Sequence, residues 1–124
     1  MTPRTLSSSS IVGTSVRNRA KEDLGSIQDL MIDTNDGSIA YVVLSFGGFL
    51  GMGDKYFAVP MEAFTIDTEK EEFVLNVTKE KLENAPGFDK DNWPSSADTA
   101  FIDSIYNHYG YEPYYKRRSA TALV

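Results

Sequence analysis

The chain contains one histidine, His108, and its neighbours decide whether it could act as a general base. On a helix, the side chains closest to it in sequence are Ser104, Tyr111 and Glu112. These residues form no nucleophile–base–carboxylate unit, and the chain has no cysteine to serve as an alternative nucleophile. A histidine near a helix C-terminus more often compensates the helix dipole at the surface. The sequence therefore predicts a protein that is not an enzyme and that uses no cofactor.

Two other segments resemble ligand-binding loops but lack parts that such loops need. Residues 33–37 begin like a calcium loop, which requires Gly at its sixth position and Glu at its twelfth. Counted from Asp33, Gly37 is the fifth residue and Leu44 is the twelfth. Residues 47–53 contain four glycines, but a phosphate loop leads into a helix, whereas a strand-like segment follows here. Both segments are interpreted as turns between strands, and no metal site is predicted.

The glycine-rich loop nevertheless contains three large apolar residues, Phe49, Leu50 and Met52. They either fold back over the end of a barrel or contact a partner, because exposed apolar clusters commonly mark interfaces. The polar pair Asp54 and Lys55 beside them is typical of an interface rim. We favour partner contact, so the three apolar residues are the first part of a candidate interface.

Five tyrosines between residues 106 and 115 are the second part. A tyrosine ring buries a large area while its hydroxyl keeps a hydrogen-bond partner, which suits interfaces. Tyr106 and Tyr109 share the apolar face of a predicted helix and are expected to pack on the body. Tyr111, Tyr114 and Tyr115 follow that helix, and they either fasten the C-terminal segment to the body or form an interface. The tyrosines predict a homodimer or larger homo-oligomer, which also binds a protein partner whose identity the sequence does not give.

The charge of the chain is unevenly distributed. The net charge of the 124 residues is −6, but residues 20–112 contain all 18 acidic residues and only six lysines, whereas residues 116–118 are Lys-Arg-Arg. An acidic body repels phosphate backbones, so nucleic-acid binding is not expected. The longest apolar run, Ile39–Leu44, is too short to span a bilayer, and the first residues lack the apolar stretch of a signal peptide. We therefore expect a cytoplasmic protein.

Alternating apolar residues predict six short antiparallel strands within residues 10–77, in a barrel or sandwich. The expected strand ranges are 11–18, 24–33, 39–46, 55–59, 64–67 and 72–77. The apolar phase changes between Ile27 and Leu30, which indicates a bulge. The segment Asn35-Asp36-Gly37 is typical of a tight turn, because these residues tolerate positive φ.

The strand at residues 39–46 is apolar on both faces, so both faces must be covered. Strict alternation places Ile39, Tyr41 and Val43 on one face. The other face would then contain the remaining apolar residues, Ala40, Val42, Leu44 and Phe46.

After residue 77 the apolar spacing changes from that of a strand to that of a helix. Thr78 is positioned to cap a short helical turn over residues 79–84. Residues 88–94 are expected to be an irregular linker, with Trp93 as a buried anchor between barrel and helix.

A longer helix is predicted over about residues 96–109, with the start signal of Ser95 and Asp98 and the stop signal of Gly110.

The chain is expected to divide into three parts. Residues 1–9 are a disordered leader, residues 10–115 are the folded domain, and residues 116–124 are a basic flexible tail.

The order of motifs along the chain resembles the PRC-barrel domain. The motifs are Glu-Asp-Leu-Gly at 22–25, Ile-Gln-Asp-Leu-Met-Ile-Asp at 27–33, Tyr-Val-Val-Leu-Ser-Phe-Gly-Gly-Phe-Leu-Gly at 41–51, and Asp-Lys-Tyr-Phe-Ala-Val-Pro at 54–60. The segment at 84–94 is similar to that of stand-alone bacterial members, and the resemblance extends over about residues 9–115. It implies a small antiparallel β-barrel of about six strands with one C-terminal helix.

The resemblance also implies a non-catalytic interaction or assembly module. The domain is shared by the photosynthetic reaction-centre H subunit and the C-terminal part of a ribosome maturation factor. The H subunit has a membrane helix before its barrel and the ribosome factor has a further β domain, and neither is expected here. A self-associating module is the leading hypothesis. A ribosome- or RNA-associated factor and a barrel that binds a small molecule or ion are the alternatives.

Overall fold

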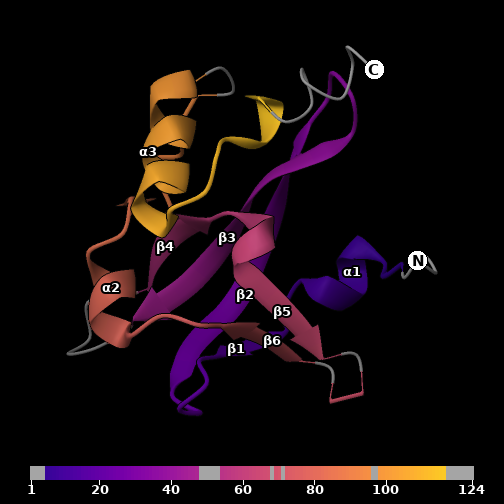
Figure 1. Ribbon diagram of the computed structural model, residues 1–124, viewed down its shortest axis with the longest axis vertical. Helices are drawn as coiled ribbons and strands as arrows, with labels where there is room; N and C mark the ends of the chain where they lie inside the picture. Colours follow the sequence, from indigo (N-terminus) through magenta and orange to yellow (C-terminus); the bar gives the residue numbers. More distant parts are fainter. Residues whose placement is uncertain (1–4, 48–53, 68, 71, 96–97, 117–124) are drawn as a thin grey trace.

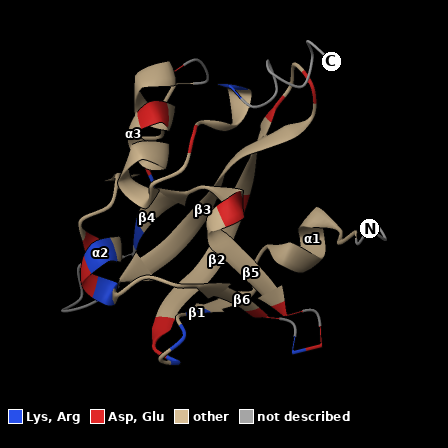
Figure 2. Ribbon diagram, viewed as in Figure 1, with Lys and Arg blue, Asp and Glu red and all other residues tan. Residues whose placement is uncertain are grey.

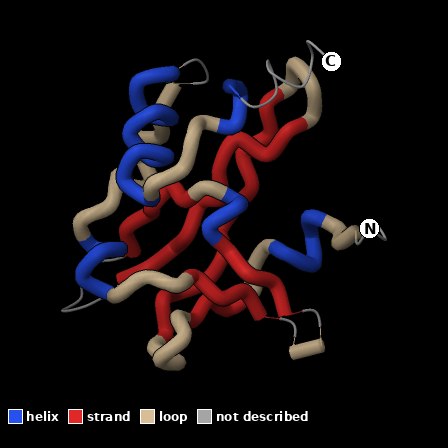
Figure 3. The backbone as a smooth tube through the Cα atoms, viewed as in Figure 1, coloured by secondary structure: helices blue, strands red, loops and turns tan. Residues whose placement is uncertain are grey.

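The computed structural model of the chain describes residues 5–47, 54–67, 69–70, 72–95 and 98–116. In this part of the chain, seven strands form one bent sheet with a single longer helix packed on its outer face (Figures 1 and 3). The elements in order are α1 (Ser8–Ile11), β1 (Ser15–Arg17), β2 (Asp23–Asp33), β3 (Ser38–Gly47), β4 (Asp54–Val59), η2 (Met61–Ala63), β5 (Phe64–Asp67), β6 (Glu72–Leu75), α2 (Lys79–Glu83), β7 (Gly87–Phe88) and α3 (Thr99–Tyr109).

The strand order in the sheet is β5-β6-β1-β2-β3-β4-β7. Neighbouring strands run antiparallel, except that β1 and β6 pair in parallel. The mainly β fold with a C-terminal helix is confirmed. The prediction of six purely antiparallel strands is wrong in two respects, since β7 is added and the β1–β6 pair is parallel. The β1–β6 pair places the first strand of the chain beside the hairpin of β5 and β6.

The N-terminal side differs from the sequence-based expectation. Residues Ser8–Ile11 form one helical turn where a disordered leader and the start of a strand were expected. The side chain of Ser7 caps this turn by accepting a hydrogen bond from the backbone N–H of Ser10, 3.2 Å away. Ile11 is buried in the core, which fixes the turn against the sheet. The first strand therefore begins only at Ser15.

Three smaller differences occur between residues 60 and 90. A 3-10 turn, η2, separates β4 from β5, in a gap to which the sequence-based prediction assigns no element. Strand β6 ends at Leu75, two residues before the predicted end. Strand β7 extends from Gly87 into the first residue of the expected linker, Phe88, whose ring packs edge-on against Tyr56 of the opposing strand, with ring centroids 6.0 Å apart.

Both faces of the sheet are covered, as the doubly apolar strand β3 requires. The inner face holds the larger core, which is closed by α2 through Leu82. The outer face of β3 and β4 packs against α3 in a second core. Its buried residues are Ala40, Tyr41, Val43, Ala58, Phe88, Ile105 and Tyr106.

A β-bulge changes which residues of β3 face each core. Met31 pairs with Tyr41, but the next strand residue, Ile32, pairs with Ile39, so Ala40 is the extra residue. Ala40 therefore joins Tyr41 in the outer core, while Ile39 packs against the inner one. The strict alternation expected from the sequence holds from Tyr41 onward and fails before it. The second irregularity, between Ile27 and Asp29, is the bulge that the sequence predicts.

The ends of α3 are fixed by their capping groups. Asp98 is the N-cap, and its carboxylate accepts a hydrogen bond from the backbone N–H of Phe101, 2.9 Å away. Gly110 ends the helix in the left-handed conformation, with φ at 80°. The predicted stop is confirmed, whereas the start lies at Asp98 rather than at Ser95. Trp93 is 39% exposed, so the expected buried anchor is wrong: its ring lies on Phe88, and its indole N–H donates to the backbone.

Candidate binding surface around the C-terminal helix

The helix α3 is held on the sheet by one fully buried tyrosine. Tyr106 has no exposed surface, and its hydroxyl donates a hydrogen bond of 2.6 Å to the carbonyl oxygen of Ala40. Ala40 is the bulged residue of β3, so the bond joins α3 to the point where the strand pairing is irregular. Tyr109 also packs against the cores, as expected for the first two tyrosines. These two tyrosines fix the position of everything that follows the helix.

The segment that follows α3, residues 110–116, is called here the extension. It returns beside α3 toward the hairpin between β2 and β3 (Figure 1). The hydroxyl of Tyr114 donates a hydrogen bond of 2.7 Å to a carboxylate oxygen of Asp33, at the end of β2. The hydroxyl of Tyr115 donates a bond of 2.5 Å to a carboxylate oxygen of Asp103, on α3. These bonds fasten the extension to both of its neighbours, which is the first of the two alternatives for Tyr114 and Tyr115.

A pocket of about 500 Å³ lies between the hairpin, the start of α3 and the extension, and we call it the hairpin pocket. Aromatic side chains from three elements line it, namely Tyr41, Phe101, Tyr114 and Tyr115. Asp33 and Asp98 add two carboxyl groups, and no basic residue lines it in the described part of the chain. Figure 2 shows acidic positions on the hairpin, α3 and the extension around this region.

Tyr41 and Asp98 define the electrostatics of the hairpin pocket. Tyr41 is 6% exposed, and its hydroxyl makes no hydrogen bond to any residue that the structure describes. Burial raises the pKa of Tyr41, and the nearby charge of Asp98 raises it further. One oxygen of Asp98 caps α3, while no bond from the described residues reaches its other oxygen. The pair offers a hydroxyl group and an anionic acceptor to the pocket that both residues line.

A second, shallower groove of about 420 Å³ lies on the outward side of α3 and the extension, and we call it the outer groove. Tyr111 lies along it and is 39% exposed. The groove also contains a carboxylate, Asp103, and an ammonium group, Lys116. Its remaining lining residues are Ser104, Asn107 and Pro113.

The residues of the predicted interface have different positions. Phe49, Leu50 and Met52 lie outside the described residues. Tyr111 points into the outer groove, while Tyr114 and Tyr115 lie on the hairpin pocket. Sequence reasoning missed Tyr41 and Asp98 as site residues. The sequence identifies Tyr41 as a strand residue and Asp98 as part of a helix start. Only the three-dimensional structure shows that both line the same pocket.

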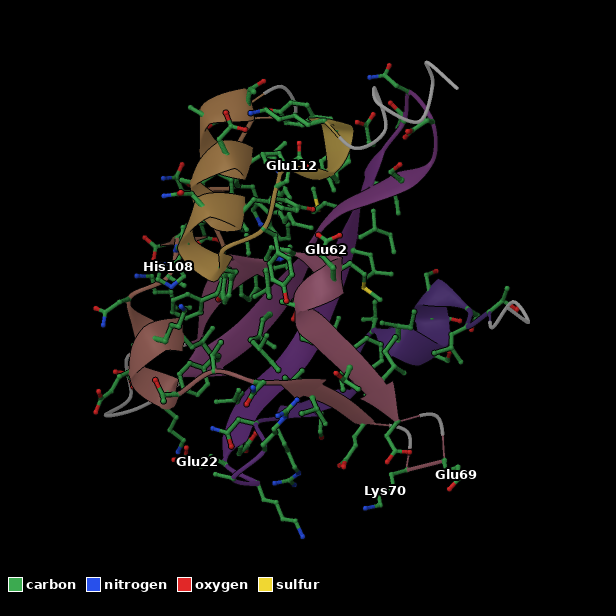
Figure 4. The ribbon with its side chains drawn as sticks, in the orientation of Figure 1. Glu22, Glu62, Glu69, Lys70, His108 and Glu112 are labelled. Carbon is green, nitrogen blue, oxygen red and sulfur yellow. The ribbon has the colours of Figure 1, made fainter. Side chains whose placement is uncertain are left out.

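The lone histidine has a local contact. One ring nitrogen of His108 lies 3.1 Å from the carbonyl oxygen of Lys81, so it connects the end of α3 to α2. Figure 4 shows His108 beside α2, away from Glu112 on the extension. Within the described residues, no group of three acidic or histidine side chains is arranged to hold a metal ion. Of the helices in that same part of the chain, none has the length and apolar character that crossing a bilayer takes.

The comparison with protein families identifies the class of the fold. The family model of the PRC-barrel domain matches residues 3–82. The chain therefore belongs to the PRC-barrel family, which confirms the resemblance seen in the sequence. A search of the curated proteins finds no match. The matched residues end in α2, so α3 and the extension, which build both the hairpin pocket and the outer groove, lie beyond them.

Proposed function

We propose that this PRC-barrel protein is a non-catalytic assembly module that self-associates through the outer groove. The observation that supports the proposal best is the fixed and exposed position of Tyr111. The extension around it is fastened by the hydrogen bonds of Tyr114 and Tyr115, so Tyr111 is presented by an ordered backbone. A rigid, partly exposed tyrosine loses little conformational entropy on binding, and tyrosine is enriched among residues that dominate interface energies.

The charges of the outer groove support a symmetric pairing of two copies. Asp103 and Lys116 lie on the same face of one chain. In a two-fold dimer, residue i of one copy meets residue j of the other, and j then meets i. An acidic and a basic side chain on one face therefore form two equivalent ion pairs across such an interface, whereas a face of one sign would repel its copy.

Replacing Tyr111 tests this proposal. We expect the native chain to sediment as a dimer at concentrations on the order of tens of micromolar, and Tyr111→Ser to weaken dimerisation by roughly tenfold or more. Sedimentation velocity over a concentration series measures both. The matched control is Val12→Ser, which removes an apolar side chain of similar exposure, 41%, from the opposite part of the molecule. A native chain that stays monomeric, or equal weakening by both substitutions, contradicts the proposal.

A second candidate function, the binding of a small ligand by the same domain, is favoured by the hairpin pocket. This pocket is separate from the outer groove, because the extension lies between them and no described residue lines both.

A further inference from the structure

We propose that the hairpin pocket binds an organic cation, namely an alkylammonium or guanidinium group. The inference does not depend on self-association, because Tyr111 does not line this pocket. It rests on three features of the pocket, which are its aromatic lining, the carboxylate of Asp98 and the hydroxyl of Tyr41.

The aromatic lining matches what an organic cation requires. Tyr41 and Phe101 are in edge-to-face contact, with ring centroids 5.9 Å apart, and Tyr114 and Tyr115 contact each other in the same way at 5.7 Å. Two ring pairs from separate elements thus line one cavity. The negatively charged face of an aromatic ring attracts a cation, and cages of this kind recognise alkylammonium and guanidinium groups. A ligand that is apolar and neutral would fit the rings but would leave the polar groups between them without partners.

The charge of the pocket selects a cation over an anion. Asp98 is the N-cap of α3, where the positive end of the helix dipole favours a carboxylate. The cap uses one of its oxygens, and the other is not engaged by the described residues. No basic side chain lines the pocket in this part of the chain, so an anionic ligand would be repelled by the free oxygen of Asp98.

The hydroxyl of Tyr41 is the second, independent indication of a ligand. The side chain of Tyr41 is 6% exposed, and the hydroxyl at its end makes no hydrogen bond to any residue that the structure describes, so the hydroxyl is available to a ligand in the pocket. Tyr41 is held in place by the edge contact with Phe101, and the Asp98 charge is close enough to raise the pKa of Tyr41. A ligand whose N–H groups reach the free oxygen of Asp98 would also offer a donor to the hydroxyl oxygen of Tyr41. An alkylammonium has three such donors and a guanidinium has a planar fork of them.

The size of the cavity fits a basic side chain or a small amine. A volume of about 500 Å³ falls in the range of small-ligand sites. The cation could be a free small molecule or a Lys or Arg side chain of a protein, and both present the same group to the pocket. Phe101, Tyr114 and Asp98 lie beyond the residues matched by the family model. The proposed binding of a cation therefore depends on the C-terminal part of this chain and not on the matched domain alone.

A titration followed by NMR tests the proposal on the full chain. Ethylguanidinium, n-butylammonium and neutral n-butanol are added separately to the 15N-labelled protein, up to concentrations on the order of tens of millimolar, since fragments of this size bind weakly. We expect saturable amide shifts near Asp98, Phe101 and Tyr41 with the two cations and none with n-butanol. The absence of saturable shifts at these residues with both cations, or equal shifts with n-butanol, overturns the proposal.

Two substitutions that preserve the fold locate the binding. Asp98→Asn removes the charge but keeps the helix cap, because Asn caps helices as well as Asp does. It is expected to weaken binding by roughly tenfold, and Tyr41→Phe, which keeps the ring, by roughly threefold. The control is Asp67→Asn, which removes the same charge from a turn that the side chain also stabilises, outside the pocket. Equal affinity in native chain and Asp98→Asn, or equal loss in the control, overturns the assignment.

A capped Gly-Arg-Gly peptide distinguishes the two sources of the cation. If the peptide binds as tightly as ethylguanidinium, the pocket is accessible to a side chain of a protein. If only the free cations bind, the pocket takes a small molecule. Either result supports an organic-cation site, whereas a peptide that binds equally well to Asp98→Asn contradicts it.

Discussion

Gly25→Ala is expected to lower the free energy of unfolding by about 3–5 kcal/mol, which is enough to unfold many domains of this size. Gly25 lies in β2 with φ at 94°, a backbone conformation that is strained for any residue with a side chain. A Cβ atom at this position would lie 2.0 Å from the carbonyl oxygen of Ser45 in β3. Neither backbone can move away easily, because the pairing of β2 with β3 begins at Ser26 and Ser45, directly beside Gly25. Urea unfolding followed by circular dichroism measures the loss.

Gly13→Ala is the matched control for this prediction. Gly13 has nearly the same φ, 93°, but a Cβ atom there would meet nothing within 4 Å. We expect this substitution to cost about 1 kcal/mol, the strain of the backbone conformation alone. The difference between the two variants measures the close approach of β2 and β3. Equal losses would show that the approach is not as tight as described.

Tyr106→Phe and Tyr109→Phe are expected to change stability in opposite directions. Tyr106→Phe removes the buried hydrogen bond to Ala40 and is expected to cost about 1–3 kcal/mol. The hydroxyl of Tyr109 is buried without a hydrogen bond to any described residue, so Tyr109→Phe is expected to be neutral or to stabilise by about 1 kcal/mol. Both substitutions remove one oxygen from a tyrosine in the same helix. Urea midpoints with unchanged slopes give the two values, and a loss in both variants would contradict the account of Tyr109.

The pH dependence of stability gives a second measurement on Tyr109. Burial raises the pKa of Tyr109 above the ordinary value of a tyrosine, about 10. Its contribution to stability is therefore full below pH 10 and is lost as the pH rises above that value, because the unfolded chain ionises first. Tyr109→Phe is expected to lose less stability than the native chain between about pH 10 and 11. Identical losses would show that the phenol is not buried in solution.

The sequence predicts most of the strands because each of them has a long enough alternation of apolar residues. The predicted β2 and β3 ranges differ from the observed ones by a residue or two, and the turn between them is where Asn35-Asp36-Gly37 predicts it. The bulge at Ala40 is not predicted, because residues 39–44 are all apolar. An extra residue in such a run does not change the pattern of apolar and polar residues from which a bulge could be inferred. The helical turn at Ser8–Ile11 was missed because one turn has almost no intrinsic stability and depends on burial of Ile11.

The candidate site is predictable only in part. The tyrosines after α3 are visible in the sequence as an unusual cluster, but whether they face outward or inward depends on where the extension runs. Tyr114 reaches Asp33, which lies 81 residues earlier, and no local pattern indicates such a pairing. Asp98 also has two roles, as a helix cap and as a pocket carboxylate, and the cap alone accounts for its presence in the sequence.

Intermolecular paramagnetic broadening tests the central proposal, self-association through the outer groove, most directly. The chain has no cysteine, so Ala100→Cys, at an exposed position on α3 one turn before the outer groove, gives a single site for a nitroxide label. Labelled chains at natural isotope abundance are mixed with unlabelled 15N chains, so that any broadening arises between copies. The account predicts broadening of the amides of Asn107, Tyr111 and Lys116, and none around Val12. Unbroadened amides along the outer groove, or broadening confined to another surface, would contradict it.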